Sequence, residues 1–107
     1  MTLAELAGVL SATGMATVYT AFPMDEEPEI PAPYIAYGVD QTQNFFADGI
    51  VYAQILNIRI LLYTAKKDLL AECTVENALR HAGLGWEKRE NDLPSDRLYE
   101  IEYGVTI

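Results

Sequence analysis

Residues 51–64 read VYAQILNIRILLYT and contain neither glycine nor proline. β-Branched and aromatic side chains are frequent in this segment, which is typical of a β-strand. Even positions from 56 to 62 are all leucine or isoleucine, whereas Asn57 and Arg59 lie between them. Successive side chains of a strand point to opposite faces, so this alternation predicts one apolar face and a second face that is at least partly exposed to water.

The predicted strand is long for the size of the chain. At the rise of a β-strand, fourteen residues span roughly 46 Å. A domain of this length has a radius of gyration of about 13 Å. We therefore expect the strand either to bend or to project from the domain at one end.

The segment before it predicts a partner strand. Residues 34–39 have an apolar alternation, and Asp48-Gly49 is a strong signal for a two-residue type I′ turn. This turn places Ala47 opposite Ile50. The further pairs that it implies are Phe45 with Tyr52, Gln43 with Gln54, Val39 with Ile58, Tyr37 with Ile60, and Ile35 with Leu62. The apolar faces of both strands coincide in this register, whereas a slip of one residue would separate them.

The sequence thus predicts a long hairpin over about residues 34–64, with its base in the core and its tip projecting. The tip carries Phe45, Phe46 and Tyr52. Aromatic side chains exposed on a lone subunit would favour association, so we expect a contact with another subunit there. The alternative is that the tip folds back over its own core.

The flanking segments predict two helices and three further strands. Thr2 and Glu5 form a capping box that begins the first helix, and Gly14 ends it near residues 12–13. The second helix is expected over residues 66–82, with Asp68 in its first turn and Gly83 after its end. Strands are expected at residues 16–22, 86–90 and 97–107, and loops at 23–33 and 91–96. Together these elements predict one α+β domain over residues 1–107, with an antiparallel or mixed β-sheet, two helices packed on one face and a long protruding β-hairpin.

The chain is strongly acidic. Sixteen acidic residues against seven basic ones give a formal charge of −9. Binding to nucleic acid requires clustered cations, and the only adjacent basic pairs, Lys66-Lys67 and Lys88-Arg89, lie among acids. We therefore expect no direct nucleic-acid binding. No apolar run approaches the length of a membrane span and the N-terminus has no basic region, so we expect a cytosolic protein without membrane contact.

The proline-rich segment 23–33 holds a run of acids: Asp25, Glu26, Glu27 and Glu29. Proline removes a backbone donor and restricts the preceding residue, so this segment predicts an exposed, extended loop. The run lacks the alternating oxygen ligands and central glycine of an EF-hand. It is either a solvated connector or a contact surface for a basic partner.

The sequence offers little for catalysis. His81 is the only histidine and is expected to be a capping or surface residue near a helix end. Cys73 is the only cysteine and is expected to be a small buried residue within the second helix. Trp86 is expected to cover the edge of the core. The glycines are scattered, so no phosphate-binding loop is indicated. We therefore expect neither an enzyme, nor a cofactor, nor a metal site.

Several short motifs resemble a family of small tail proteins of siphophages and prophages of Gram-positive bacteria. The motifs are Met1-Thr2-Leu3-Ala4-Glu5, Asn44-Phe45-Phe46-Ala47-Asp48-Gly49, Val51-Tyr52, Leu61-Tyr63-Thr64 with Lys66-Lys67-Asp68, Gly85-Trp86-Glu87-Lys88 and Leu98-Tyr99-Glu100-Ile101. They extend over nearly the whole chain, and none of them is catalytic. Proteins of this kind resemble tail-completion, tail-to-head joining or tail-terminator proteins.

The resemblance implies a structural α+β subunit that assembles with itself into a ring, commonly a hexamer. Such a ring caps the tail tube where it meets the head connector, so tail-tube and head-connector proteins would be its partners. It would be found in the host cytoplasm during assembly and then at the head–tail junction of the virion. The expected subunit interface comprises Phe45, Phe46, Asp48 and Tyr52.

Two other functions stay open at this point. One is an acidic inhibitor or immunity-type protein that uses the acidic run at residues 25–29 to bind a basic protein partner, such as a nucleic-acid enzyme. The other is a small-ligand enzyme, which would require a pocket of titratable residues with perturbed pKa values.

Overall fold

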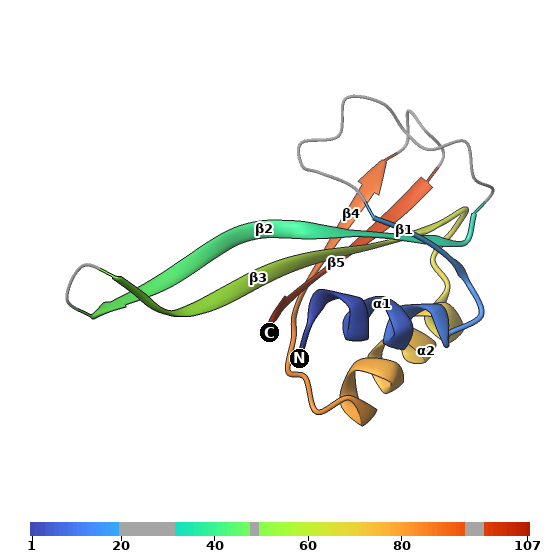
Figure 1. Cartoon of the computed structure of the whole chain (residues 1–107). Helices are drawn as coiled ribbons and strands as arrows, with labels where there is room; N and C mark the ends of the chain where they lie inside the picture. Colours follow the sequence, from blue (N-terminus) through green and yellow to red (C-terminus); the bar gives the residue numbers. More distant parts are fainter. Residues whose placement is uncertain (20–31, 48–49, 94–97) are drawn as a thin grey trace.

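A computed structural model describes residues 1–19, 32–47, 50–93 and 98–107; for residues 41–47, 50–55 and 92–93 it describes the backbone. The elements are α1 (Leu3–Ser11), β1 (Ala16–Tyr19), β2 (Tyr34–Ala47), β3 (Ile50–Thr64), α2 (Leu69–His81), β4 (Glu87–Leu93) and β5 (Leu98–Thr106). Both helices lie on one face of a single sheet (Figure 1). This confirms the predicted α+β class.

The sheet is mixed and has the strand order β1-β2-β3-β5-β4. β1 runs parallel to β2, while the β2–β3, β3–β5 and β5–β4 pairs are antiparallel. β3 is therefore a central strand near the body of the molecule, with β2 on one side and β5 on the other.

The main core fills the space between the helices and the sheet. It is formed by Leu6, Leu10, Ile35, Tyr37, Ile58, Ile60, Leu62, Ala71, Val75, Leu79, Ile101, Tyr103 and Val105. The even positions of β3 and the odd positions of β5 contribute to it, as the alternation in the sequence predicts. Trp86 packs against the edge of this core, which confirms its expected role.

The opposite face of the sheet, here called the outer face, carries a second apolar cluster at the base of β2 and β3. Tyr34, Ala36, Leu61 and Tyr63 are buried there. The rings of Tyr34 and Tyr63 stack with their centroids 4.9 Å apart. The base of β3 is therefore apolar on both faces, whereas Asn57 and Arg59 further along the strand are partly exposed, so this face is partly wet, as expected.

α1 begins after its N-cap Thr2, as predicted, whereas α2 begins at Leu69 rather than at Lys66, because Asp68 is its N-cap. Thr2 Oγ1 accepts a hydrogen bond from the Glu5 backbone N–H at 3.1 Å, and Asp68 Oδ1 accepts one from the Ala71 N–H at 3.1 Å. Gly14 and Gly83 follow the helices with φ angles of +85° and +77°. A side chain is strained in this left-handed region, which explains glycine at both positions.

The predicted register of β2 and β3 is right at both ends and wrong between them. Ile35↔Leu62, Tyr37↔Ile60, Val39↔Ile58 and Ala47↔Ile50 are all observed. Between them, Phe45 pairs with Ala53 and Gln43 with Ile55, so the predicted partners Tyr52 and Gln54 are wrong. The register shifts once between Val39 and Gln41 and once between Phe45 and Phe46. Asp40 is the additional residue on β2 and Tyr52 the additional residue on β3, so the two β-bulges cancel.

Two other expectations are wrong. Residues 91–93 belong to β4 rather than to a loop, because Asn91 and Asp92 pair with Glu100 and Tyr99 of β5. Cys73 is exposed rather than buried. The buried positions of α2 are 71, 72, 75 and 79, so position 73 falls on the opposite side of the helix.

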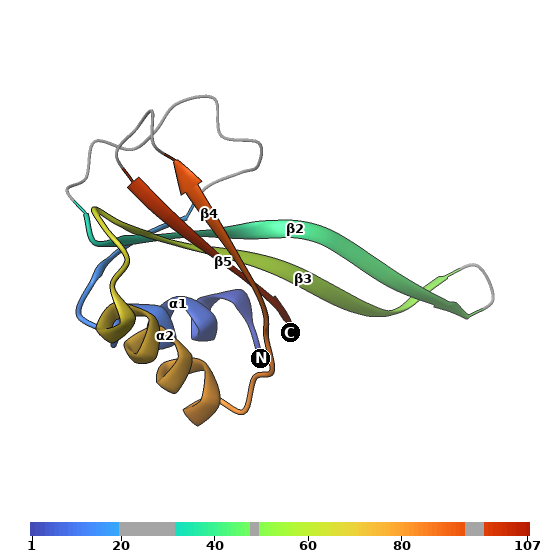
Figure 2. The same cartoon turned by 180° about the vertical axis from the view of Figure 1, so that it is seen from behind.

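The distal parts of β2 and β3 extend beyond the rest of the molecule (Figures 1 and 2). The largest extent of the chain is 50 Å, and its radius of gyration is 14.7 Å. A compact domain of this length would have about 13 Å, so the long strand projects, as its length predicts. Residues 48 and 49 lie outside the described residues, so the type I′ turn and the hairpin that it would close stay a prediction.

The substitutions Leu79→Ala and Leu70→Ala make the same change at a buried and at an exposed position of α2. The Leu79 side chain is fully buried, and Leu70 is 78% exposed. Removing Leu79 leaves a cavity in the core and should lower the free energy of unfolding by about 2–5 kcal/mol. Leu70→Ala should change it by less than about 0.5 kcal/mol. Urea denaturation of dilute protein measures both, and equal losses would contradict the described core.

Candidate functional site

The distal parts of β2 and β3, residues 41–47 and 50–55, form a two-stranded ribbon that we call the arm. β1 pairs with β2 only at residues 34–37. β5 pairs with β3 from Asn57 to Thr64, and the backbones of Leu56 and Ile107 exchange the last two hydrogen bonds. Both outer edges of the arm thus have no strand partner in the described part of the chain. Unpaired backbone N–H and C=O groups of this kind can accept a further strand.

The residues predicted to form an interface map to the arm. Phe45 and Phe46 lie in β2 and Tyr52 in β3, where the structure describes the backbone. Asp48 lies outside the described residues. By sequence, residues 41–55 contain no charged residue other than Asp48. The arm thus combines free strand edges with an almost uncharged sequence in a chain of net charge −9.

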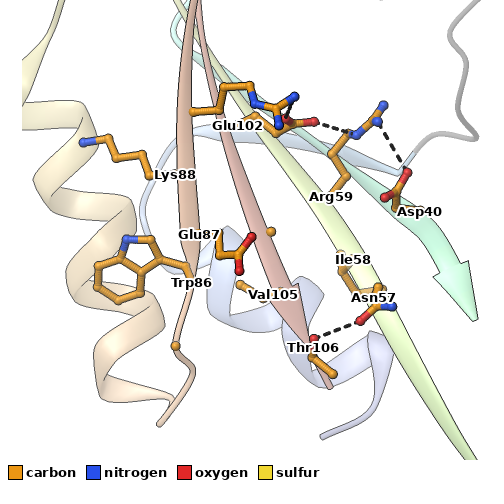
Figure 3. A pocket seen from close by; sticks show the side chains of 13 residues that line it. Asp40, Asn57, Ile58, Arg59, Trp86, Glu87, Lys88, Glu102, Val105 and Thr106 are labelled. Atoms are coloured by element: carbon orange, nitrogen blue, oxygen red, sulfur yellow. Dashed lines mark hydrogen bonds and ion pairs between the residues drawn. The ribbon is translucent and has the colours of Figure 1, made fainter. Parts of the chain in front are cut away.

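Next to the arm, the outer face of the sheet carries a row of charges across four strands. Arg59 on β3 contacts Asp40 on β2, with Nη2 to Oδ1 at 3.4 Å, and Glu102 on β5, with Nε to Oε1 at 2.7 Å (Figure 3). Arg89 on β4 extends the row, with Nη1 at 3.8 Å from Glu102 Oε2. Asp40 occupies the bulge position on β2, and its carboxylate contacts Arg59 from there.

This row borders an open pocket of about 700 Å³. Arg59 has glycine opposite it on both neighbouring strands, Gly38 on β2 and Gly104 on β5. A side chain added at Gly104 would meet nothing within 4 Å, so glycine there leaves the pocket open. Asn57 and Thr106 close its far end through a hydrogen bond of 2.9 Å (Figure 3).

The chemistry of the pocket is that of a polar contact surface. Its described lining includes three acidic residues and three basic ones: Asp40, Glu87, Glu102, Arg59, Lys88 and Arg89. Five of these six form ion pairs. The lining therefore presents no excess of one charge for a phosphate or a cation. None of the described lining residues is a histidine, cysteine or serine.

On the helix side, α2 and β4 are joined by a cluster of lysines and glutamates. Glu72 on α2 is only 2% exposed. Lys88 Nζ lies 2.7 Å from Glu72 Oε1, and Lys67 Nζ lies 3.1 and 3.0 Å from its two carboxylate oxygens. Lys67 also pairs with Glu90 on β4. Glu72 Oε2 makes no hydrogen bond with a described residue, so its contact with Lys67 is mainly electrostatic.

A second carboxylate completes this cluster. Glu76 Oε2 accepts hydrogen bonds from Lys88 Nζ at 2.9 Å and from the Tyr103 hydroxyl at 2.8 Å. Burial, helped by the hydrogen bond to Glu76, raises the pKa of Tyr103 well above its ordinary value. The hydroxyl therefore stays protonated and serves as a donor that ties α2 to β5.

The cluster shifts the pKa values of its members in opposite directions. Burial alone would raise the pKa of Glu72, but hydrogen bonds from Lys88 and Lys67 outweigh it and the pKa is lowered. The hydrogen bond to Glu72 raises the pKa of Lys88 to about 12. These shifts favour the charged forms of Glu72, Lys67 and Lys88 at neutral pH, so the three side chains form ion pairs.

The remaining predicted positions lie apart from the arm and the pocket. His81 is exposed at the end of α2, as expected. The acids Asp25, Glu26, Glu27 and Glu29 lie outside the described residues. Sequence reasoning missed Glu72, although its spacing of three and seven residues from Val75 and Leu79 places it on the buried stripe of the helix.

Comparisons with models of known protein families and with curated proteins give no match for this chain. No helix in the described part of the structure is long and apolar enough to cross a membrane. The described residues also contain no group of three or more potential metal ligands. No matching family or curated protein therefore indicates a function, and the arm and the pocket are the features from which one can be inferred.

Glu72→Gln tests the lysine–glutamate cluster. The variant leaves two ammonium groups beside a neutral amide, so its free energy of unfolding at pH 7 should fall by about 1–3 kcal/mol. The folded-state pKa of Glu72 lies below its ordinary value of 4.5. Its stabilisation is therefore complete above that pH and is lost as the pH falls through the folded-state pKa. Urea denaturation should therefore show that the difference in the free energy of unfolding between the variant and the unmodified protein becomes smaller below pH 4.5.

Glu87→Gln is the matched control, because Glu87 is exposed on β4 and makes no ion pair with a described residue. This variant should match the unmodified protein within about 0.5 kcal/mol. A difference in the free energy of unfolding between Glu72→Gln and the unmodified protein that stays constant from pH 7 to pH 3 would show that the ionised form of Glu72 does not stabilise the fold.

Proposed function

We propose that this protein is a structural subunit of the phage head–tail interface, which joins or caps the tail tube as one member of a ring. The observation that carries this proposal is the arm, which extends beyond the core with both strand edges unpaired among the described residues. The sequence resemblance to tail-completion proteins of siphophages supports the same function. The ring would assemble in the host cytoplasm and remain in the virion.

The two sides of the sheet support assembly through the arm. β4 is an edge strand in which five of the seven residues are charged: Glu87, Lys88, Arg89, Glu90 and Asp92. Charged side chains on an edge strand discourage pairing with another chain. The arm has no such protection in its strands, since its only charged residue is Asp48 between them. Strand addition is therefore favoured at the arm and opposed at β4.

The charge of the chain suits a ring through which DNA passes. A net charge of −9 on each subunit repels the duplex, so a lumen lined by such subunits would hold no DNA by phosphate contacts. The cations of the outer face support this view, because Arg59 and Arg89 already pair with carboxylates. They are not available as a phosphate-binding patch.

Light scattering after size exclusion tests the proposed function. At high protein concentration, or after mixing with tail-tube protein, the chain should form a closed oligomer of defined mass. Phe45→Ser and Phe46→Ser together should abolish this oligomer, because they replace the largest apolar residues of the arm. Circular dichroism should show that the variant stays folded.

Glu87→Ser and Arg89→Ser on the charged edge strand provide the control and should leave assembly intact, because both side chains are exposed and neither contacts the buried Glu72. A strict monomer at all concentrations, with and without the tail-tube protein, would overturn the proposal. Electron microscopy of the mixture should show the oligomer at one end of the tube, and its absence there would argue against a joining role.

A further inference from the structure

The N-terminus of α2 exposes two adjacent leucines. Leu69 is 67% exposed and Leu70 is 78% exposed, the highest values among the large apolar side chains that the structure describes. Cys73, which is also exposed, lies four and three residues further on and therefore on the same side of the helix. These residues form a small apolar patch, here called the leucine patch.

The leucines do not serve the fold of their own chain. α2 is held against the sheet by Val75 and Leu79, which are fully buried, and its first turn is capped by Asp68. Isolated exposed leucines are common, but two in sequence at one helix end form a site that association would cover.

The leucine patch lies at the opposite end of the molecule from the distal ends of β2 and β3. β3 begins at the arm with Ile50 and ends at Thr64, and Leu69 follows only five residues later. Figures 1 and 2 show the start of α2 at the same end of the molecule as the end of β3, far from the distal ends of β2 and β3. The described strands of the arm therefore lie away from the patch of their own chain, so a contact between the two surfaces joins different copies.

The composition of the arm suits an apolar patch on an acidic chain. By sequence, the strands of the arm, residues 41–47 and 50–55, contain no charged residue. In a chain of net charge −9, an uncharged arm approaches a neighbour without the repulsion that acidic surfaces cause. The leucine patch offers such an arm apolar side chains, and its nearest charge by sequence, Lys66, is exposed and makes no ion pair with another described residue.

We propose that the leucine patch is the docking site for the arm of a second copy of this chain. The inference rests on the proposed function and names its subunit contact. Two different patches meet, so the contact is heterologous, and repetition of it closes a ring when the rotation between neighbours permits. The sheet edges of the arm remain free to add backbone hydrogen bonds within the same contact.

Cys73 allows a direct test, because it is the only cysteine of the chain and borders the patch. In the variant Asn44→Cys, a short bismaleimide should join residue 44 of one copy to Cys73 of the next. Each chain then has two reactive positions, so denaturing electrophoresis should show a ladder that extends beyond dimers. Mass spectrometry should identify the linked peptides as those with residues 44 and 73.

Two controls make the result decisive. Asn44→Cys combined with Cys73→Ser should give no ladder, and dimers linked through residue 44 in that protein would indicate an arm-to-arm contact and overturn the proposal. Glu87→Cys places the second thiol on the charged edge strand and should give no ladder through Cys73.

Leu69→Ser with Leu70→Ser should weaken association on the order of 100-fold, as expected for two leucines that lose their burial in the contact. Both side chains are exposed, so the thermal midpoint of the dilute protein should not change. If the Asn44→Cys protein forms the oligomer by light scattering but gives no ladder with the bismaleimide, the proposed contact is wrong and the ring proposal stands. If no association occurs with or without the tail-tube protein, both are wrong.

Discussion

The antiparallel pairing of β2 with β3 is the constraint on which the rest of the structure depends. Near the body, this pair is enclosed by β1, β5 and both helices, and it supplies five of the thirteen described residues of the main core and all four buried residues of the second apolar cluster on the outer face. Further out, the same pair continues without neighbours among the described residues. Two bulges, at Asp40 and Tyr52, shift the register and then restore it, so the pairing continues from Tyr34↔Tyr63 to Ala47↔Ile50. One continuous element thus provides both the stability of the domain and a surface for assembly.

Each face of the sheet carries its own set of ion pairs, and the two sets have different roles. On the helix side, Lys67 and Lys88 compensate the buried Glu72 and bind α2 to β4. On the outer face, Arg59 connects Asp40 at the bulge with Glu102. Most cations of this acidic chain are therefore used within the subunit. This use explains how a protein with few bases can be well folded and still present a surface that repels DNA.

The sequence predicts the elements well because hydrophobic periodicity and capping residues are local signals. The α+β class, both helix caps and the pairs from Ile35↔Leu62 to Val39↔Ile58 follow from it. The register at the centre of the arm does not follow from the sequence, because β-bulges depend on interactions between the strands and the turn residues do not indicate them. Residues 91–93 read as a loop by composition, yet pairing with β5 overrides this preference. The spacing of Glu72 places it on the buried stripe of α2, but the compensation of its charge depends on Lys88 from a distant segment. The exposure of Leu69 and Leu70 likewise depends on which segments pack against α2.

Amide hydrogen exchange of the dilute and the assembled protein tests the central claim most directly. In dilute protein, the edge amides of the arm should exchange quickly, since no described strand covers them. On assembly, peptides that cover residues 41–55 should gain protection, whereas peptides from the charged edge strand at residues 87–93 should not change. Protection that appears at residues 87–93 while the arm stays unprotected would contradict this account.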